Sequence, residues 1–402
     1  MARTDHRGSR GPRRVLGGVA VALVAALFGA SQPAAASAVS AAAGPCSPAW
    51  ARWQQFKHGF ISADGRVIDV GSADERTVSE GQAYALFFAL VANDRATFDE
   101  LLRWTENNLA AGDLTSHLPA WLWGRDKDGN WRVLDANAAS DADVWIAYTL
   151  LQAGVLWRER SYTARGSVLA RHIVEQETAT LPGLGLTLLP GPQGFHLRPD
   201  EWRLNPSYLP LPVLQGLAER LPDEPRWKRL TESASTVLRD TAEQGFAPDW
   251  ALYQTGRGFL PDTRTQAKGS YDAIRVYLWA GMLDPAQPDA KAVLAHLTPF
   301  ADYIAQHGAP YESIDTTNGH ATNAGNAGFS AAAVPFLVAL GRTGQADAQA
   351  ARVHSLEAHE PLGYYSNVLA LFGLGWRDGL YRFAVDGALV VQWKAACASG
   401  VR

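Results

Sequence analysis

The sequence has little cysteine and lacks the motifs of several hydrolase classes. It contains two cysteines in 402 residues, and neither resembles a catalytic nucleophile. No His-Glu-x-x-His motif occurs, and His354 and His359 are five residues apart, which places them on different faces of a helix. Metal-dependent hydrolysis is therefore not indicated. A serine hydrolase would need a Gly-x-Ser-x-Gly turn between a strand and a helix, and no strand-rich core is visible.

The composition that is present is that of an ordinary globular protein. Hydrophobic residues make up 47% and charged residues 19% of the chain, with 37 glycines and 22 prolines. This composition supplies ample material for a core, and it excludes an intrinsically disordered or collagen-like chain.

Residues 1–38 have the three parts of a secretory signal peptide, namely a basic stretch, an apolar run from Val15 to Ala30 and a small-residue exit. The apolar run is too short to span a membrane comfortably. Paired arginines before it leave both the general and the twin-arginine export routes open. We expect cleavage after Ala38 or as late as Ala43, and therefore a periplasmic or secreted protein with no stable membrane span.

The charge that remains after cleavage argues against nucleic acid as a partner. Removing residues 1–38 takes away five arginines and Asp5, which leaves 31 basic and 39 acidic side chains and a net charge of −8. An acidic exported protein is a poor nucleic-acid binder, because phosphate binding needs clustered cations.

The two cysteines, Cys46 and Cys397, stand near the two ends of residues 39–402, which we expect to form a single domain. In an oxidising compartment a disulfide between them is the economical interpretation. Two separate thiols are the alternative.

Helical periodicity dominates from residue 47 to about residue 376, and it is clearest from Glu80 to Ala92. Every second helix-like segment is richer in Ala, Gly and aromatic residues, as expected of helices enclosed on most sides, and the others carry more Arg, Glu and Asp. The twelve segments are 47–58, 80–92, 95–110, 141–157, 162–176, 207–220, 225–243, 271–283, 287–307, 329–341, 344–355 and 362–375.

This alternation predicts an all-α fold, an (α/α)6 barrel of six inner and six outer helices. The first four buried segments begin 61, 66 and 64 residues apart, a spacing typical of stacked helical hairpins. The inner helices of such a barrel run parallel, so their N-terminal ends share one face. Residues 381–385 and 389–393 predict a small C-terminal β-hairpin.

Three acids stand at the predicted starts of inner helices: Glu80, Asp141 and Asp272. Each has a serine nearby that we expect to cap the helix. Acids in a first helical turn also complement the helix dipole, worth about 0.3–1 kcal/mol each, and this is the alternative to a functional role. A parallel inner ring brings all three to one mouth, where carboxylates can divide the work of acid and base.

Tryptophan is abundant, with 14 residues, as many as phenylalanine. Indole N–H groups require partners when buried, so we interpret this number as more than a core needs. Trp121 and Trp123 lie in the linker before the second inner helix, where exposed rings can stack on sugar faces. Packing under a loop is the alternative.

The segment from Ala139 to Trp157 resembles the signature helix of glycoside hydrolase family 8, with Thr149 where the pattern usually has Ser or Ala. Further segments resemble the branch of this family that is encoded with bacterial cellulose synthase, including the positions of the two cysteines. These segments are 79–84, 119–124, 205–210, 270–277 and 328–332, which cover the chain after the signal peptide in order.

The resemblance implies an (α/α)6 endoglucanase that hydrolyses β-1,4-glucan with inversion and needs no cofactor or metal. By motif, Glu80 is the proton donor and Asp272 is the base that activates water. Asp141 matches the signature aspartate, which some accounts label a nucleophile. An inverting enzyme forms no covalent intermediate, so we assign Asp141 to holding the distorted sugar and supporting its transition state. Glu80 must then be protonated near the working pH and Asp272 ionised.

Four further residues are expected to contact substrate: Tyr208, Tyr271, Asp143 and Arg275. The two tyrosines stand at the starts of inner helices, and a place in the core is their alternative. Arg275 follows Asp272 by one helical turn and can pair with an acid and keep it charged. A surface salt bridge is the alternative for Arg275.

The expected substrate is cellulose, trimmed as it is made, with a cellulose synthase complex as a partner. Within the family the substrate can instead be chitosan, mixed-linkage glucan or xylan, and the net charge of −8 would suit cationic chitosan. Outside catalysis, the alternative is a glucan-binding scaffold that guides the polymer. The presence of all three carboxylates argues against a scaffold.

Overall fold

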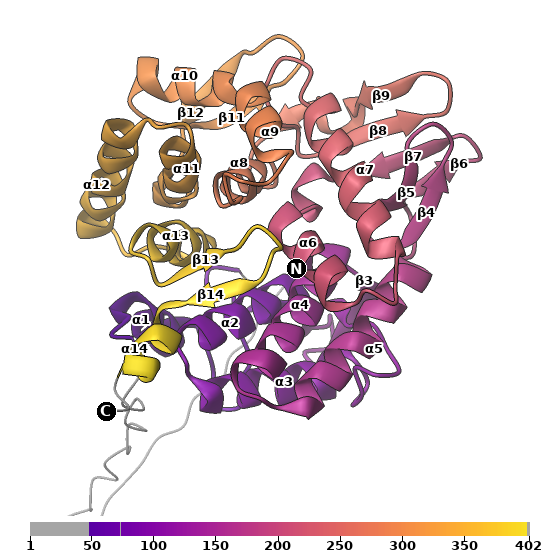
Figure 1. Cartoon of the computed structure of the whole chain (residues 1–402), viewed down its shortest axis with the longest axis vertical. Coiled ribbons are helices and arrows are strands. Elements are labelled where there is room, and N and C mark those ends of the chain that lie inside the picture. The colour runs from indigo at the N-terminus through magenta and orange to yellow at the C-terminus, as the bar shows by residue number, and fades with distance from the viewer. Residues whose placement is uncertain (1–47, 73, 400–402) are drawn as a thin grey trace, which may run out of the picture. The chain divides into compact units, whose positions relative to one another are not determined.

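The computed structural model describes residues 48–399 except residue 73, and helices dominate this part of the chain (Figure 1). The described residues form α1 (Ala51–Phe60), α2 (Ser79–Val91), α3 (Arg95–Leu109), α4 (Ser140–Leu156), α5 (Arg160–Gln176), α6 (Leu211–Arg220), α7 (Arg226–Asp240), α8 (Ile274–Gly281), α9 (Ala290–His296), α10 (Thr298–His307), α11 (Ala327–Ala339), α12 (Thr343–His359), α13 (Tyr364–Arg377) and α14 (Gln392–Ser399), with short 3-10 helices η1 (Pro206–Tyr208) and η2 (Thr263–Thr265).

Six of these helices form an inner ring, in the order α2, α4, α6, α8, α11 and α13, each packed against the next. The ring closes where Phe372 of α13 meets Phe88 of α2, with ring centroids 4.6 Å apart. Outside them lie α3, α5, α7, α9, α12 and α1, which pack against the inner helices in the same order (Figure 1). The predicted (α/α)6 barrel is confirmed.

Proline explains two of the differences between the predicted and the observed helices. The segment predicted from 287 to 307 is divided into α9 and α10 near Pro299, which has no backbone N–H to continue the first helix. The sixth predicted helix begins at Leu211, after η1, because Pro210 disfavours helical geometry in the residue before it.

The inner helices are buried on all sides, as their composition predicts. In α4 every residue from Ser140 to Gly154 is buried. Glycine permits the closest approaches between inner helices, since a Cβ atom at Gly281 of α8 or Gly373 of α13 would collide with the backbone of α11.

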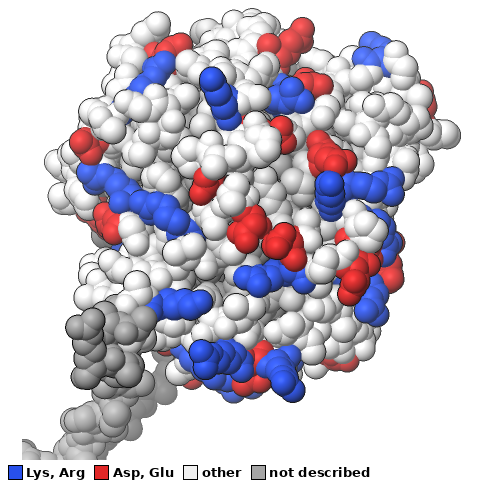
Figure 2. Space-filling view, viewed as in Figure 1, with Lys and Arg blue, Asp and Glu red and all other residues white. Residues whose placement is uncertain are grey.

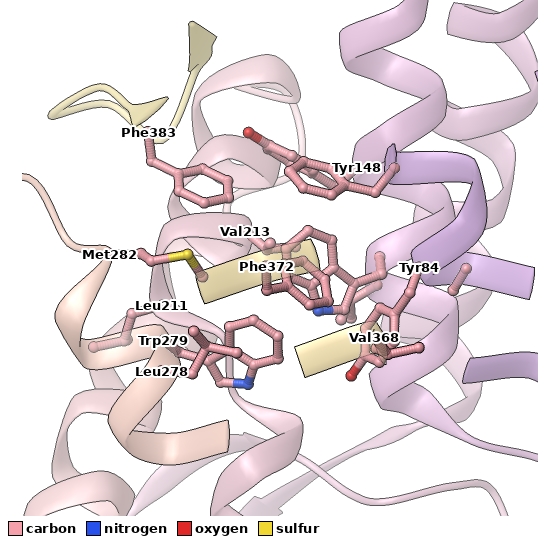
Figure 3. Close-up of a cluster of buried hydrophobic side chains, with 14 of the residues drawn as sticks. Tyr84, Tyr148, Leu211, Val213, Leu278, Trp279, Met282, Val368, Phe372 and Phe383 are labelled. Carbon is pink, nitrogen blue, oxygen red and sulfur yellow. The ribbon is translucent and has the colours of Figure 1, made fainter. Parts of the chain in front are cut away.

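Aromatic side chains fill the space enclosed by the inner ring (Figure 3). Phe372 lies 5.0 Å from Tyr84 and 5.1 Å from Trp279 between ring centroids. The fully buried side chains include Trp53, Trp145, Trp227 and Trp279. The interpretation that 14 tryptophans exceed the needs of the core is therefore wrong for these four, which are themselves core residues.

Short antiparallel sheets occupy the connections, which the helical prediction did not anticipate. Four of them precede inner helices, at the end of the ring where α2, α4, α6 and α8 begin. The sheets are β1 (Thr77–Val78), β2 (Ala120–Arg125) and β3 (Trp131–Ala138); β4 (Thr178–Leu181) and β5 (Gly185–Leu188); β6 (His196–Arg198), β7 (Glu201–Leu204), β8 (Ala251–Gln254) and β9 (Gly258–Pro261); β10 (Lys268–Gly269), β11 (Tyr311–Asp315) and β12 (Ala321–Ala324); and β13 (Tyr381–Phe383) with β14 (Leu389–Val391).

The predicted C-terminal hairpin is confirmed as β13 and β14, paired from Tyr381–Val391 to Phe383–Leu389. It covers the C-terminal ends of inner helices: Gly387 accepts a hydrogen bond from Tyr148 of α4 at 2.8 Å, and Leu389 donates to Gln152 of α4 at 3.2 Å. In Figure 1 it crosses in front of the inner ring. The hairpin therefore closes the end of the ring opposite to the helix N-termini.

Figure 2 shows the face that carries this hairpin, with Lys and Arg interspersed among Asp and Glu. Within the described residues, no helix combines the length and the apolar character needed to cross a membrane. The predicted signal segment 1–38 and Cys46 lie outside the described residues. Cys397 packs against the hydrophobic core, and its pairing with Cys46 stays a prediction.

Candidate active site

Three predicted acids converge on one arginine at the N-terminal ends of the inner helices. Glu80 is the second residue of α2, Asp141 is the second residue of α4, and Asp272 lies two residues before α8. Arg275 is the second residue of α8. Its Nη1 donates a hydrogen bond to Glu80, and its Nη2 donates one to Asp272 Oδ1 at 3.0 Å. Nη2 also lies 3.7 Å from Asp141 Oδ2.

Arg275 is the buried centre of this cluster and forms no surface salt bridge. Its side chain is 4% exposed, and Nη2 also donates to Ser207 Oγ at 3.0 Å. Burial opposes the charge of the guanidinium, but the acidic groups around it, Glu80 first and with it Asp272, together outweigh burial and raise the pKa of Arg275 well above its usual value. The arginine therefore stays charged and holds three carboxyl groups around it.

The carboxyl groups of Glu80 and Asp141 form a coupled pair. Burial, and next the charge of Glu80, raise the pKa of Asp141 well above its usual value, although Arg275 and the Ala142 N–H oppose this. Glu80 is the more accessible of the two carboxyl groups, with 18% of its side chain exposed, whereas the Asp141 side chain is 3% exposed. Asp141 is therefore the group for which burial most strongly favours the protonated form.

Asp272 lies in a different environment, held by donors and open to the mouth. Its Oδ2 accepts a hydrogen bond from Asn205 Nδ2 at 3.1 Å, and its Oδ1 accepts from Arg275. Its side chain is 31% exposed, which leaves room for water beside the carboxylate. Two charge-favouring donors suit a group that must accept a proton.

The serines predicted to cap these helices do not do so. Ser79 and Ser140 are the first helical residues of α2 and α4, and their hydroxyl groups have no hydrogen-bond partner. Ser270 Oγ instead donates to the carbonyl oxygen of Glu312 at 2.6 Å. The turn before α8 is held instead by Asp249, whose carboxylate accepts the Ala273 N–H at 2.9 Å.

Tyr208 connects the acid cluster to a row of aromatic rings. Its ring lies 5.9 Å from the Arg275 guanidinium and 6.1 Å from the ring of Trp250. Trp250 is stacked parallel to Phe195 at 5.9 Å and carries Arg203 at 3.9 Å. Rings near the acids can support sugar faces.

Tyr271 lies at the rim of the mouth and is 44% exposed. Its hydroxyl donates to Glu312 Oε1 at 2.9 Å, and its carbonyl oxygen accepts from the Tyr365 hydroxyl at 2.7 Å. Burial raises the pKa of Tyr365, which lies near Arg275, Glu80 and Asp272. Tyr271 is thus accessible to substrate. Tyr365, on α13, lies beside the acid cluster.

The two tryptophans predicted to stack on sugar, Trp121 and Trp123, have different surroundings in the structure. Both lie on β2, which pairs with β1 just before Glu80. Trp123 is packed against Trp131, 4.9 Å away and nearly parallel, and against Trp104 at 5.3 Å, so the packing alternative describes Trp123. Trp121 is half-buried and hydrogen-bonds Asp135, whose pKa it lowers. Trp121 is the better candidate for sugar contact.

Asp143 does not lie at the mouth, which corrects its assignment to substrate contact. It is fully buried beside Glu177, the residue after α5, and its charge helps burial to raise the pKa of Glu177. A side chain with no exposed surface cannot touch a sugar. Asp141 and Asp143 are two residues apart on α4, so their side chains point to different sides of the helix.

Several site residues were not found from the sequence: Asn205, Ser207, Asp249, Trp250 and Tyr365. Asn205 and Ser207 stand in the segment 205–210 that resembles the family, and this was the available signal. Among the residues that the structure describes, no group of three or more His, Cys, Asp or Glu side chains is arranged to hold a metal ion.

Comparisons with known proteins agree with this geometry. A model of the family Glycosyl hydrolases family 8 matches residues 28–379. The endoglucanase of Xanthomonas axonopodis pv. citri (strain 306) is 48% identical over 390 residues, which cover 96% of this chain and 99% of that protein. The endoglucanase of Escherichia coli (strain K12) is 45% identical over 352 residues, which cover 87% of this chain and 93% of that protein. The solved structure of an endo-1,4-D-glucanase from Vibrio fischeri ES114 has a TM-score of 0.81 and 43% identity, covering 86% of this chain and 99% of that chain.

A ring of six inner helices with three acids around one arginine, matched over most of its length by hydrolases, defines a glycoside hydrolase. More specifically, the chain belongs to glycosyl hydrolase family 8.

Proposed function

We propose that this enzyme is an endo-β-1,4-glucanase that hydrolyses cellulose with inversion of configuration. The observation that carries the proposal is the binding of Glu80 and Asp272 to opposite nitrogens of Arg275, in unlike environments. Relatives that are named endoglucanases, at 45–48% identity over most of both chains, support the choice of substrate class.

In this mechanism the Glu80 carboxyl group donates its proton to the glycosidic oxygen as the bond from C1 to that oxygen breaks. A water molecule attacks C1 from the opposite face of the sugar and gives a proton to Asp272. Separate acid and base groups with room for one water between them are the requirement for inversion. The new reducing end then has the α configuration.

Asp141 supplies the proton reservoir and supports the transition state. Because burial and the nearby charge of Glu80 raise its pKa, Asp141 favours the protonated form and can supply a proton beside the acid. Arg275 meanwhile holds the Asp272 carboxylate through the 3.0 Å contact and Glu80 through its other guanidinium nitrogen. The arginine thus fixes the positions of the base and the acid relative to each other.

Sugar rings bind along the aromatic residues on both sides of the acids. Tyr208 and Trp250 form one platform, and Trp121 on β2 provides another. An apolar ring face presented beside a polar acid cluster suits pyranose units, which have one apolar face and polar edges.

The cellular role that we propose rests on the sequence alone. The signal-like segment 1–38 favours export to the periplasm, where the enzyme would trim nascent cellulose beside a cellulose synthase complex. Chitosan and xylan are the other substrates to be compared. A non-catalytic scaffold is disfavoured because Glu80, Asp141 and Asp272 converge on a single cation.

The variant Glu80→Gln tests the proposal. The amide cannot donate a proton as a carboxylic acid does, so turnover of a soluble cello-oligosaccharide is expected to fall about 100- to 10,000-fold. Binding of the same oligosaccharide, measured by calorimetry, is expected to change little. Unchanged turnover would remove Glu80 from the role of acid, and turnover of xylan or chitosan oligosaccharides alone would replace the substrate.

A further inference from the structure

Asp249 lies in the connection between α7 and β8, yet its carboxylate reaches the segment that carries Asp272. Its Oδ1 accepts hydrogen bonds from three backbone N–H groups, those of Ser270, Asp272 and Ala273, at 2.7, 3.1 and 2.9 Å. Asp249 itself is 7% exposed. A single buried oxygen thus binds the backbone of Asp272 and of residues on both sides of it.

The backbone around Asp272 needs this support because it is not helical. Residues 271–273 form turns, and α8 begins only at Ile274. Backbone N–H groups in a turn need partners when they are buried. Asp249 supplies such a partner for the turn before α8, and its own backbone N–H donates to the Lys268 carbonyl oxygen at 2.8 Å. The loop of Asp249 and the loop of Asp272 are therefore tied together in both directions.

Asp272 is consequently held at two levels. Asn205 and Arg275 hold its side chain, while Asp249 holds its backbone. Catalytic groups must be held within about 0.5 Å of the productive position. A misplacement of about 1 Å can cost on the order of 100-fold in rate.

The charge of Asp249 also faces the base. The titratable groups directed at it are Asp272, Lys268 of β10, Tyr277 of α8 and Tyr311 of β11. Burial and then the charge of Asp272 raise the pKa of Asp249 to about 6. The hydrogen bonds that Asp249 accepts from backbone N–H groups and the positive charge of Lys268 oppose the rise. The two carboxyl groups are therefore electrostatically linked.

We propose that Asp249 is a positioning residue for hydrolysis, which fixes the backbone of Asp272 and so directs the base carboxylate toward the attacking water. This inference rests on the proposed function, since it takes Asp272 as the base. Asp249 touches neither substrate nor water in this role and acts through Asp272.

The test compares Asp249→Ala with Asp249→Asn on a soluble cello-oligosaccharide. Alanine removes the acceptor, so kcat is expected to fall about 10- to 100-fold with KM within about twofold. Asparagine keeps an oxygen acceptor and is expected to restore most of kcat. Because asparagine also removes a negative charge beside the base, the acidic limb of the kcat profile is expected to move to lower pH.

Asp94→Asn is the matched control, because Asp94 caps α3 through Thr97 and follows the C-terminal end of α2, whereas Glu80 lies at the N-terminal end of that helix. It is expected to leave kcat and its pH profile unchanged. Asp249 is not a positioning residue if its alanine variant keeps kcat within twofold of the wild type, or if both variants lose activity equally with an unshifted profile. Should the alanine variant fail to fold, the pH profile of Asp249→Asn decides alone.

Asp272→Asn separates failure of this inference from failure of the proposed function. If Asp272→Asn loses turnover and the Asp249 variants do not, only the positioning role is wrong. If Asp272→Asn keeps turnover, Asp272 is not the base, and the positioning role is overturned with it.

Discussion

Helix α4 contributes one aspartate to each of two buried carboxyl pairs, and only one of these pairs lies beside a cationic side chain. Asp141 pairs with Glu80 beside Arg275, whereas Asp143, two residues further along α4, pairs with Glu177 inside the wall of the barrel. Burial raises the pKa of both aspartates well above the usual value. The two acids of one short motif therefore have different neighbours, an arginine for Asp141 and a second carboxyl group alone for Asp143.

The difference shows that a buried carboxyl group with a raised pKa can belong either to an active site or to the interior of the barrel wall. At the mouth, Arg275 compensates negative charge, and the Glu80 side chain is 18% exposed. In the wall, no oxygen of the Asp143 or Glu177 carboxyl groups has a hydrogen-bond partner. Both wall groups are buried, so neither can exchange a proton with a substrate.

The largest expected effect separates the two aspartates of α4. Asp141→Asn removes the carboxyl group beside Glu80 and Arg275, so kcat is expected to fall about 100-fold or more. Asp143→Asn, at the same depth on the same helix, is expected to keep kcat within about threefold. Steady-state kinetics on a cello-oligosaccharide measure both. Equal losses would show that burial on α4, rather than contact with Glu80 and Arg275, explains the effect.

A smaller effect concerns stability and pH. Because burial raises the pKa of both Asp143 and Glu177, the folded chain binds protons that the unfolded chain has released. Their contribution to stability is complete below the unfolded pKa values near 4 and is lost as the pH rises through the folded pKa values. Asp143→Asn removes one titrating group and leaves an amide that can donate to Glu177.

The expected result is that Asp143→Asn gains about 1–2 kcal/mol in the free energy of unfolding relative to the wild type between pH 5 and pH 8. Denaturant unfolding at the two pH values measures this difference. Asp94→Asn serves as the control, since Asp94 pairs with Lys57 and has a lowered pKa. A wild-type-minus-variant difference that is the same at both pH values would mean that the wall pair does not titrate.

The barrel and the three acids could be predicted because their signals are local. The apolar periodicity of segments such as 80–92 is strong, and Glu80, Asp141 and Asp272 stand at the starts of alternate buried segments. The connecting strands escaped prediction because several have only two to four residues, too few to show an alternating pattern. The capping serines were wrong because Ser79 and Ser140 already belong to the first helical turn.

Asp249 and Asp143 show what the sequence could not show. Asp249 lies 23 residues before Asp272, in a loop whose course no local pattern determines. Asp143 shares the motif of Asp141, and only the position of Glu177 after α5 reveals that it faces the wall. In both cases the deciding partner comes from another part of the chain.

The most direct test of this account is time-resolved proton NMR of the enzyme acting on a soluble cello-oligosaccharide, recording which anomer of the new reducing end appears first. Separate acid and base roles for Glu80 and Asp272 predict the α-anomer, because water attacks from the face opposite to the leaving group. Initial formation of the β-anomer would mean retention through a covalent intermediate and would contradict the account.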